Sequence, residues 1–413
     1  MRRIGNSYIA ALDVGTVKIA CFIARIDHTG AIDVIGIGHQ LSKGIKSGAI
    51  TDIKLAESCI RSAVASAEQM AEHNIDKVII NISGSQQRSS ILNVSIPTSS
   101  QQVNNKDIAK LIDFGFEAKQ SNQRDIIHCI PIDYSLDGES GIKDPKGMFS
   151  KKLSASLHII DASATTVFNM ANCLAQCHLD VDGYIASSYA SGLACLDDEE
   201  KELGSILIDF GGGNTSIAVF KGAKIIYSGS VPIGGMHVTN DIAHGTSTNI
   251  KTAERLKTLY GNLHLTAKDE QEIIDISESA DDYDSETNHI PKALLHEIIK
   301  PRIEETLELV KSDLEKHKML HNSSKIVITG GASQLAGLKD FCESYFKKKV
   351  RIGVPRNISG LAENTRGPAF ATCAGILHFA LRKKYHDYDD LSSRDILFIR
   401  PVARAIKWFK NNF

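Results

Sequence analysis

The sequence lacks a strong charge of either sign and a disulfide framework. Its formal net charge of -2 gives no overall attraction to nucleic acid. The eight cysteines are scattered, and such usage favours a reducing cytoplasm. Cys173, Cys177 and His178 lie in an apolar helical run without a second ligand pair, so we interpret them as core residues and not as metal ligands.

Long hydrophobic runs are also missing. No uncharged apolar run reaches the roughly 20 residues that a membrane-spanning helix needs. The basic start at residues 1–3 is followed by an apolar segment that Asp13 interrupts, which argues against a signal peptide. A chain of 413 residues is too long for one hydrophobic core, so we expect two lobes.

Two stretches half a chain apart share one pattern: an apolar strand, an Asp, a glycine turn, a Thr and a second strand. The first is residues 8–20 with Asp13, and the second is residues 206–219 with Asp209. Glycines let the backbone approach a ligand closely, and successive N–H groups can form an anion-binding concavity. Each Asp could hold a metal ion beside phosphates. The repeat therefore predicts a duplicated fold that clamps a phosphate between its halves.

The turns lead into strands, so they are neither Walker loops nor Rossmann fingerprints. A polar segment interrupts the first half, and two helices of small residues, 189–196 and 368–375, could approach each other closely. The expected segments are the first lobe at 1–84, an inserted α/β subdomain at 85–157, the first lobe with its hinge helix at 158–200, the second lobe at 201–365 with an outer subdomain at about 230–320, the second hinge helix at 366–382, a flexible linker at 383–395 and a terminal helix at 396–413.

The terminal segment is basic and aromatic. On a helix, its polar face carries Arg404, Lys407 and Lys410, with Arg400 just before it. Its other face carries bulky apolar residues: Val402, Ile406, Trp408, Phe409 and Phe413. This pattern is typical of a helix that lies in a membrane interface. A helix docked on the protein's own surface is the alternative. One short helix binds weakly, whereas several copies in a polymer bind firmly by avidity.

A third glycine motif follows a strand at Thr329, Gly330, Gly331 and Ser333. Together with the two hairpins and the two small-residue helices, it resembles the actin-like ATPase superfamily over nearly the whole chain. Within it the sequence is most similar to the FtsA family of bacterial cell-division proteins. Further features carry this likeness: the turn at 44–48, the insert, residues 186–189, residues 301–305 and the tail.

The resemblance implies an α/β actin-like fold of two ribonuclease-H-like lobes, with the inserted subdomain and a C-terminal amphipathic helix. It implies ATP and Mg²⁺ in the cleft, with Mg²⁺ held by Asp13 and Asp209 through water. The nucleotide-binding residues implied are Asp13, Gly15, Thr16, Lys18, Asp209, Gly211, Gly212, Gly213, Asn214, Thr215, Glu254, Lys257, Gly330, Gly331 and Ser333.

Hydrolysing members of the superfamily place a carboxylate or an amide in the first hinge helix to orient the attacking water. Here that stretch offers Ser187, Ser188 and Tyr189. Because positioning this water is much of what a protein adds to phosphoryl transfer, we expect tight ATP binding with weak or absent hydrolysis. Alternatively Asp13 or Asp209 suffices through Mg²⁺ and gives ordinary turnover.

The resemblance also implies partners. They are the C-terminal peptide of the tubulin-like protein FtsZ, received on the second lobe near Arg302, further copies of the chain in a polymer, later division proteins and an anionic membrane surface, but no nucleic acid. It places the protein peripherally on the cytoplasmic face of the inner membrane at the division site. Two alternatives are a small-molecule kinase and a pilus-assembly adaptor of the same superfamily.

Overall fold

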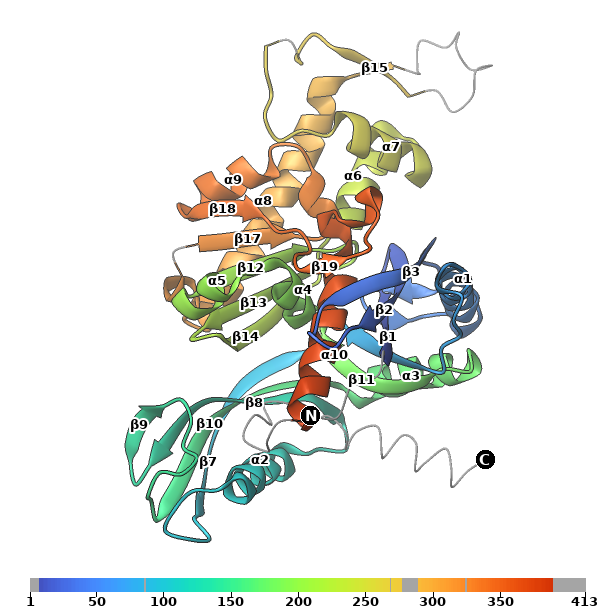
Figure 1. Cartoon of the computed structure of the whole chain (residues 1–413). Coiled ribbons are helices and arrows are strands. Elements are labelled where there is room, and N and C mark those ends of the chain that lie inside the picture. The colour runs from blue at the N-terminus through green and yellow to red at the C-terminus, as the bar shows by residue number, and fades with distance from the viewer. Residues whose placement is uncertain (1–6, 85–86, 268, 277–288, 324, 389–413) are drawn as a thin grey trace.

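The computed structural model describes residues 7–84, 87–267, 269–276, 289–323 and 325–388. Two lobes, each built on a β-sheet, lie side by side in Figure 1, the second at the upper left and the first at the right, and a third sheet lies at the lower left of the view. The predicted terminal helix at 396–413 and most of the predicted linker lie outside the described residues.

The first lobe has a six-stranded sheet in the order β11-β6-β1-β2-β3-β19. Its strands are β1 (Ser7–Val14), β2 (Lys18–Ile26), β3 (Ile32–Leu41), β6 (Lys77–Ile82), β11 (Asp180–Ala186) and β19 (Ile358–Ser359). Helices α1 (Ile53–Ala71) and α3 (Ala164–Gln176) cover one face, and β4 (Ile45–Lys46) and β5 (Ala49–Ile50) form a small hairpin. Asp52 caps α1 by accepting from the N–H of Leu55, and the helix buries Ala56, Ile60 and Ala63 at helical spacing.

The second lobe repeats this topology in the order β14-β13-β12-β17-β18. Its strands are β12 (Ser205–Phe210), β13 (Thr215–Lys221), β14 (Lys224–Val231), β17 (Lys325–Thr329) and β18 (Lys349–Ile352). In both lobes the first three strands are antiparallel and the next two pair in parallel. The duplication that the two hairpins predicted is therefore present in the sheets.

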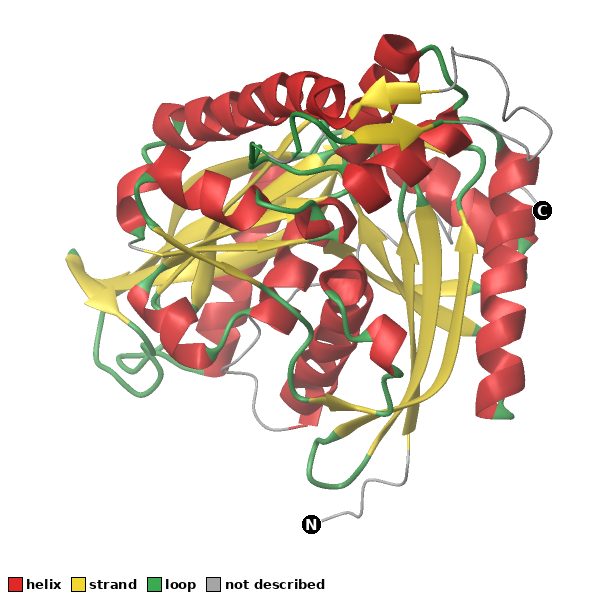
Figure 2. Cartoon of the chain, turned by 90° about the horizontal axis from the view of Figure 1, so that it is seen from above, coloured by secondary structure: helices red, strands yellow, loops and turns green. Residues whose placement is uncertain are grey.

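Helices cover the outer face of the second sheet, as the view from above shows (Figure 2). They are α6 (Gly235–Thr246), α7 (Ile250–Tyr260), α8 (Lys292–Lys316) and α9 (Leu338–Phe346), with the short hairpin β15 (Ile273–Asp275) and β16 (His289–Pro291) at the end of the lobe. Helix α8 runs through Pro301 without a break, with buried residues on both sides of it such as Ile299 and Ile303.

Helices α4 (Ser187–Cys195) and α10 (Ala371–Tyr388) lie between the two sheets and share one core with both lobes. They pack so closely that a Cβ on Gly375 would lie 1.8 Å from the carbonyl oxygen of Ala190. Helix α10 continues to Tyr388, past the predicted hinge boundary at residue 382.

The chain crosses between the lobes twice. The first crossing runs through α4 and the short helix α5 (Asp198–Leu203). The second lies between β18 and β19, because β19 pairs with β3 in the first-lobe sheet. The chain thus returns to the first lobe before residue 365, the predicted end of the second lobe. The 3-10 turn η4 (Gly331–Gln334) follows β17 in the second lobe, and the 3-10 turns η5 (Glu363–Thr365) and η6 (Pro368–Phe370) lie between β19 and α10.

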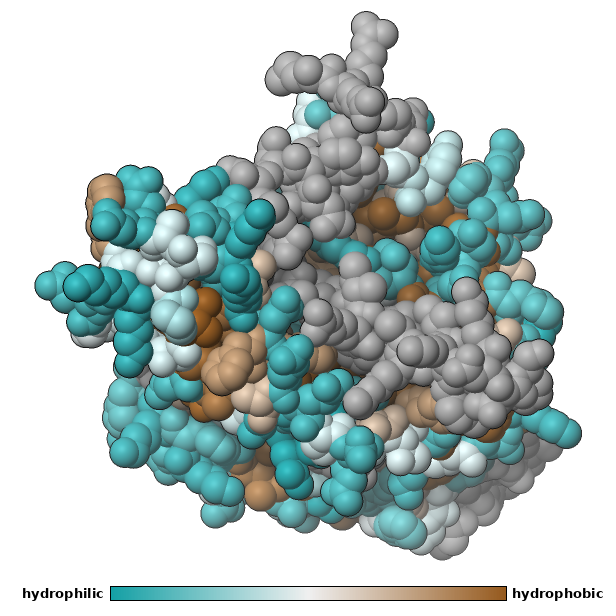
Figure 3. Space-filling model, turned by 90° about the horizontal axis from the view of Figure 1, so that it is seen from below, coloured by the Kyte–Doolittle hydropathy of each residue, from teal (hydrophilic) through white to brown (hydrophobic). Residues whose placement is uncertain are grey.

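The insert is a four-stranded sheet in the order β7-β10-β8-β9, covered by one helix. Its elements are β7 (Arg88–Pro97), α2 (Asn105–Lys119), β8 (Arg124–Leu136), β9 (Glu139–Ile142) and β10 (Lys152–Ser163). The last strand of the insert, β10, pairs with both β7 and β8 and therefore belongs to this sheet. Seen from below, on the side of the insert, hydrophilic residues predominate and hydrophobic ones form small separate groups (Figure 3).

Two buried histidines join the insert to its neighbours. His128 on β8 accepts from the N–H of Ala186 with Nε2 at 2.9 Å. His158 on β10 donates from Nδ1 to the carbonyl oxygen of Ile225 on β14, at 3.0 Å. Burial lowers the pKa of His128 to about 3 and that of His158 to about 4. The insert therefore contacts both lobes through neutral imidazoles.

No helix among the described residues is both long and apolar enough to cross a bilayer.

Candidate functional site

The turns of the two hairpins have the same geometry. The N–H of Gly15 donates to the carbonyl oxygen of Lys18 at 3.0 Å, and the N–H of Gly211 donates to that of Asn214 at 3.0 Å. A Cβ on either glycine would lie 2.8 Å from the oxygen that its own N–H contacts. Both turns therefore exclude a side chain at this position, which explains the glycine in each copy of the motif.

A cavity of about 220 Å³ lies between these turns and the third glycine motif. Its lining includes eleven of the predicted residues: Asp13, Gly15, Thr16, Lys18, Asp209, Gly211, Gly212, Gly213, Asn214, Gly330 and Gly331. The tips of the turns contact each other beside it, because a Cβ on Gly212 would lie 2.3 Å from Cγ2 of Val17. The two lobes thus meet at the point where the sequence predicts a phosphate.

Asp209 is the buried carboxylate of the second lobe. Its Oδ2 accepts from the hydroxyl of Ser191 at 2.6 Å and from that of Thr372 at 3.3 Å. Burial raises the pKa of Asp209, while these two hydroxyls oppose the shift. Both hydroxyls come from the hinge helices α4 and α10, so the hinge holds this carboxylate in place.

Asp13 is its counterpart in the first lobe. Its Oδ1 accepts from the amide of Asn81 at 2.8 Å. Burial raises the pKa of Asp13 to about 7; Lys18 opposes this shift and Asp209 adds to it. Two desolvated carboxylates that face one cavity favour a cation between them.

Lys18 lies beside this pair but is directed toward η6. Its ammonium donates to the carbonyl oxygen of Ala369 at 2.7 Å and lies 3.1 Å from the centroid of the Phe370 ring. Burial lowers the pKa of Lys18, and Asp13 opposes that shift. Lys18 therefore ties β2 to the start of α10 while it still lines the cavity.

Three further residues contact the two aspartates although the motifs do not point to them: Asn81, Ser191 and Thr372. Asn81 is the one polar residue in the apolar strand 78–82, and this exception was the available signal. Its amide also donates to Ser187 Oγ at 3.0 Å, and its oxygen accepts from the N–H of Val14 at 2.8 Å. Ser191 and Thr372 carried no such signal, because many small polar residues occur in the hinge helices.

The cavity fits a phosphate with Mg²⁺. The side-chain oxygen of Asn214 is buried and has no hydrogen-bond partner among the described residues. Buried polar atoms are normally paired, so this acceptor leaves a place for a donor such as a water or a hydroxyl group. The described residues contain no cluster of three or more His, Cys, Asp or Glu that could hold a metal alone. Mg²⁺ commonly uses one or two carboxylates together with phosphates and water, which matches Asp13 and Asp209.

Four predicted residues do not line this cavity. Thr215 was expected to offer its hydroxyl, but the hydroxyl donates to the carbonyl oxygen of Ile233 at 2.7 Å. Side chains alternate along a strand, so Ser216 lines the cavity instead. The hydroxyl of Ser333 donates to the carbonyl oxygen of Gly330 at 2.7 Å and supports the third turn.

Glu254 and Lys257 lie on α7, behind the second hairpin. The ammonium of Lys257 contacts Glu254 Oε2 and Thr239 Oγ1, each at 2.7 Å, and the carbonyl oxygen of Gly235 at 3.2 Å. The N–H of Gly235 in turn donates to the carbonyl oxygen of Gly211 at 2.9 Å. The pair thus reaches the glycine turn only through α6.

Arg302, the predicted partner-binding residue, lies on α8 in the second lobe. Its guanidinium makes ion pairs with Asp241 on α6 and with Glu305 on its own helix, and 27% of its side chain is exposed. These pairs raise its pKa and join α6 to α8.

Family models match two parts of the chain. The model of the cell division protein FtsA matches residues 206–375, and that of the SHS2 domain inserted in FtsA matches residues 84–161. These ranges cover the second lobe and the insert.

Among solved structures, the PilM-PilN type IV pilus biogenesis complex is similar with a TM-score of 0.64 and 14% identity, covering 90% of this chain and 98% of that one. MreB 5 of Spiroplasma citri bound to AMPPNP is similar with a TM-score of 0.54 and 13% identity, covering 94% and 99%. At such low sequence identity, these similarities bear on the fold alone. The structural similarity confirms the predicted actin-like architecture.

Among curated proteins, the cell division protein FtsA of Rhizobium meliloti (strain 1021) is 40% identical over 380 residues, which are 89% of this chain and 86% of that protein. At this identity and coverage the likeness extends beyond the fold. The chain belongs to the family of the cell division protein FtsA.

Proposed function

We propose that this chain is an ATP-binding adaptor that ties a division ring of FtsZ to the cytoplasmic membrane. The observation that carries the proposal is the cavity between two matched glycine turns, with one buried Asp contributed by each lobe. A nucleotide phosphate with Mg²⁺ would contact both lobes there. Nucleotide binding would thereby favour one arrangement of the lobes, and with it self-association into a polymer.

Residues of both lobes would contact the bound nucleotide and its Mg²⁺. Gly15, Gly211 and Gly212 line the cavity with backbone and no side chain, and Asn214 offers its unpaired side-chain oxygen to a water or ribose hydroxyl. Asp13 and Asp209 would hold Mg²⁺, which neutralises phosphate charge when bound. Similarity to an MreB 5 structure bound to AMPPNP supports nucleotide binding at an equivalent cleft.

Hydrolysis in this proposal is weak or absent. The hinge helix α4 offers hydroxyls and no carboxylate or amide: Ser187 donates to the carbonyl oxygen of Ile82 at 3.1 Å, and Ser191 donates to Asp209. The nearby amide of Asn81 donates to Asp13 and Ser187. These groups therefore support the cleft and do not orient a water molecule for attack.

The proposal also includes the partners that the resemblance to the FtsA family implies. The second lobe near Arg302 receives the C-terminal peptide of FtsZ, later division proteins are recruited, and residues 396–413 hold the assembly at the cytoplasmic face of the inner membrane. The match of the inserted domain to the FtsA family favours this function over a small-molecule kinase or a pilus-assembly adaptor.

The test is calorimetric titration with Mg·ATP, with phosphate release followed in the same samples. We expect wild type to bind one nucleotide, to release little phosphate, and to lose most of its affinity in the Asp209→Asn variant. Asp33→Ala is the matched control, because Asp33 is a surface carboxylate that pairs with Arg25 away from the cleft. Brisk phosphate release would contradict the slow-hydrolysis part, and no binding by wild type would overturn the proposal.

A further inference from the structure

A separate cavity of about 290 Å³ lies where the chain crosses between the lobes. The end of α4 and helix α5 contribute Asp197, Asp198 and Lys201 from the first crossing. Arg356 comes from the second crossing, and Arg382 comes from α10. The cavity is therefore bordered by both covalent connections of the hinge.

The ammonium of Lys201 is the most buried charge of this cavity. The side chain is 7% exposed, yet its one described carboxylate contact is Asp198 at 3.4 Å, and that side chain is 98% exposed. Such a solvated partner compensates little of the cost of burying a charge. Burial lowers the pKa of Lys201, and Arg382 lowers it further.

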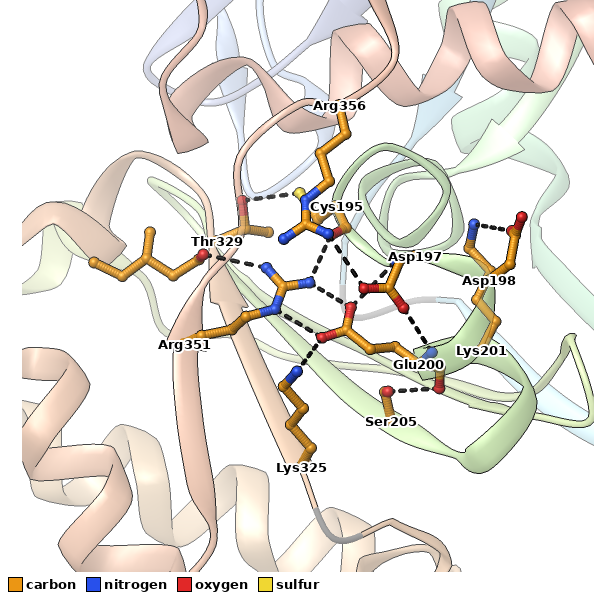
Figure 4. A network of polar contacts seen from close by, with 11 residues as sticks. Cys195, Asp197, Asp198, Glu200, Lys201, Ser205, Lys325, Thr329, Arg351 and Arg356 are labelled. Carbon is orange, nitrogen blue, oxygen red and sulfur yellow. Dashed lines mark hydrogen bonds and ion pairs between the residues drawn. The ribbon is translucent and has the colours of Figure 1, made fainter.

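The ion pairs around the neighbouring Glu200 differ from the poorly compensated charge of Lys201. Figure 4 shows Glu200 between Arg351 and Lys325, which both contact its carboxylate, while the side chain of Lys201 reaches toward Asp198. On the side of α5 that faces β17 and β18, two cations thus form ion pairs with the one buried carboxylate of Glu200. On the cavity side, no carboxylate pairs with Arg382 among the side chains that the structure describes.

The remaining polar groups of the cavity do not supply a negative charge that balances Lys201 and Arg382. Asp197 accepts from the N–H of Glu200 at 2.7 Å and pairs with Arg356 at 3.3 Å. His378 on α10 donates from Nε2 to the carbonyl oxygen of Arg356 at 2.8 Å. Its pKa is lowered to about 4 by burial and by the cations Lys201 and Arg382, so the ring is neutral. Counting the exposed Asp198, three cations face two carboxylates.

We propose that this hinge cavity binds a small soluble anion with a phosphate or carboxylate group, held by Lys201, Arg382 and Arg356. A buried ammonium and guanidinium groups are the side chains that recognise such anions. Because Lys201 and Arg356 belong to different crossings, the bound anion joins the two connections and restrains the hinge. The proposal does not depend on the nucleotide site, which lies at the other end of α4.

The experiment uses the full chain and two probes, inorganic phosphate and citrate, with chloride as the reference anion. Binding is measured by calorimetry for wild type, Lys201→Met and Arg382→Gln. Lys339→Met is the matched control, because this lysine pairs with its neighbour Asp340 at 3.6 Å on the surface of α9. Amide hydrogen exchange at residues 353–357 reports on the restraint of the second crossing, independently of the nucleotide cleft.

We expect phosphate or citrate to bind wild type at one hinge site and to slow exchange at 353–357. Each hinge variant should bind at least about tenfold more weakly, the loss expected for one charge-assisted contact, while Lys339→Met should bind like wild type. Preference for phosphate or for citrate identifies the class of natural ligand. If neither probe binds wild type, or if all variants bind alike, the inference is overturned. Arg382→Gln keeps the test decisive even where Lys201→Met does not fold.

Discussion

At the scale of single residues, the cleft depends on side chains that hold its carboxylates. Ser191 is fully buried, and its hydroxyl donates to Asp209 at 2.6 Å. We predict that Ser191→Ala weakens Mg·ATP binding by about tenfold, because a hydrogen bond to a charged group contributes roughly 1.5–3 kcal/mol. Titration with Mg·ATP measures this change.

The control is Ser188→Ala on the same helix. Ser188 is equally buried, but its hydroxyl pairs with that of Ser228 at 2.9 Å, away from both aspartates. Its Mg·ATP affinity should stay within about twofold of wild type. Equal losses in the two variants would mean that Ser191 acts through general packing and not through Asp209.

The sequence predicts those residues of the candidate site that stand out from their surroundings by residue type. An Asp at the end of an apolar strand and a glycine after it are conspicuous, and Asp13, Asp209 and the glycines do meet in one cavity. Thr215 was misread because the facing of a strand residue depends on register. The role of Thr372 could not be predicted from local sequence, since its contact with Asp209 spans 163 positions of the chain.

At the scale of elements, the contact between α4 and α10 allows the two sheets to share one core. The Cα of Gly375 lies against the backbone of Ala190, so a methyl group has no space there. We predict that Gly375→Ala destabilises the protein by about 1–3 kcal/mol, the usual cost of overpacking. Urea unfolding measures the change.

Gly367→Ala serves as its counterpart, because a Cβ at Gly367 meets no atom within 4 Å. This variant should be as stable as wild type or slightly more stable, since alanine restricts the unfolded chain. A midpoint for Gly375→Ala equal to that of wild type would show that the helices can separate at little cost.

Acid should weaken the attachment of the insert. His128 and His158 have folded pKa values of about 3 and about 4, below the ordinary value of 6.5. A lowered folded pKa means that stability is complete above pH 6.5 and is lost as the pH falls toward the folded value. Between pH 7.5 and pH 5.5, each histidine should therefore cost about 1.4 kcal/mol of unfolding free energy.

Urea unfolding at these two pH values tests this expectation. Replacing His128 by Asn removes one titrating ring, so the difference in unfolding free energy between the two pH values should shrink by about 1.4 kcal/mol relative to wild type. His28→Asn provides a comparison on an exposed turn. An unchanged difference in His128→Asn would show that other groups carry the acid sensitivity.

Most elements of the fold followed from local patterns. The apolar strands of the two hairpins are directly visible as hydrophobic runs. Short elements such as α5 and β9 give no such signal, since polar residues dominate them. The end of the second lobe was placed too late because β19 is only two residues long and joins the first sheet through β3.

At the scale of the whole molecule, the proposed membrane contact rests on residues 396–413, outside the described structure. We predict that removing residues 400–413 abolishes co-sedimentation with liposomes that contain anionic lipid. The basic and the apolar face of the tail both contribute to binding, so the loss should be nearly complete. Sedimentation across a range of lipid concentrations measures it.

A full-length Asn411→Ser variant should still sediment with the liposomes, because it changes the polar face without changing charge. Sedimentation of the truncated chain at the level of wild type would place the membrane contact elsewhere in the protein.

The junction between the insert and β14 has a mechanical consequence. His158 donates to the carbonyl oxygen of Ile225, and Ser89 accepts from the N–H of Ser228, so the insert is joined to the second lobe although its chain leaves from the first. His128 joins the insert to the first lobe through the N–H of Ala186. A rotation of one lobe relative to the other would therefore strain one of these two attachments, and the insert would resist such a rotation.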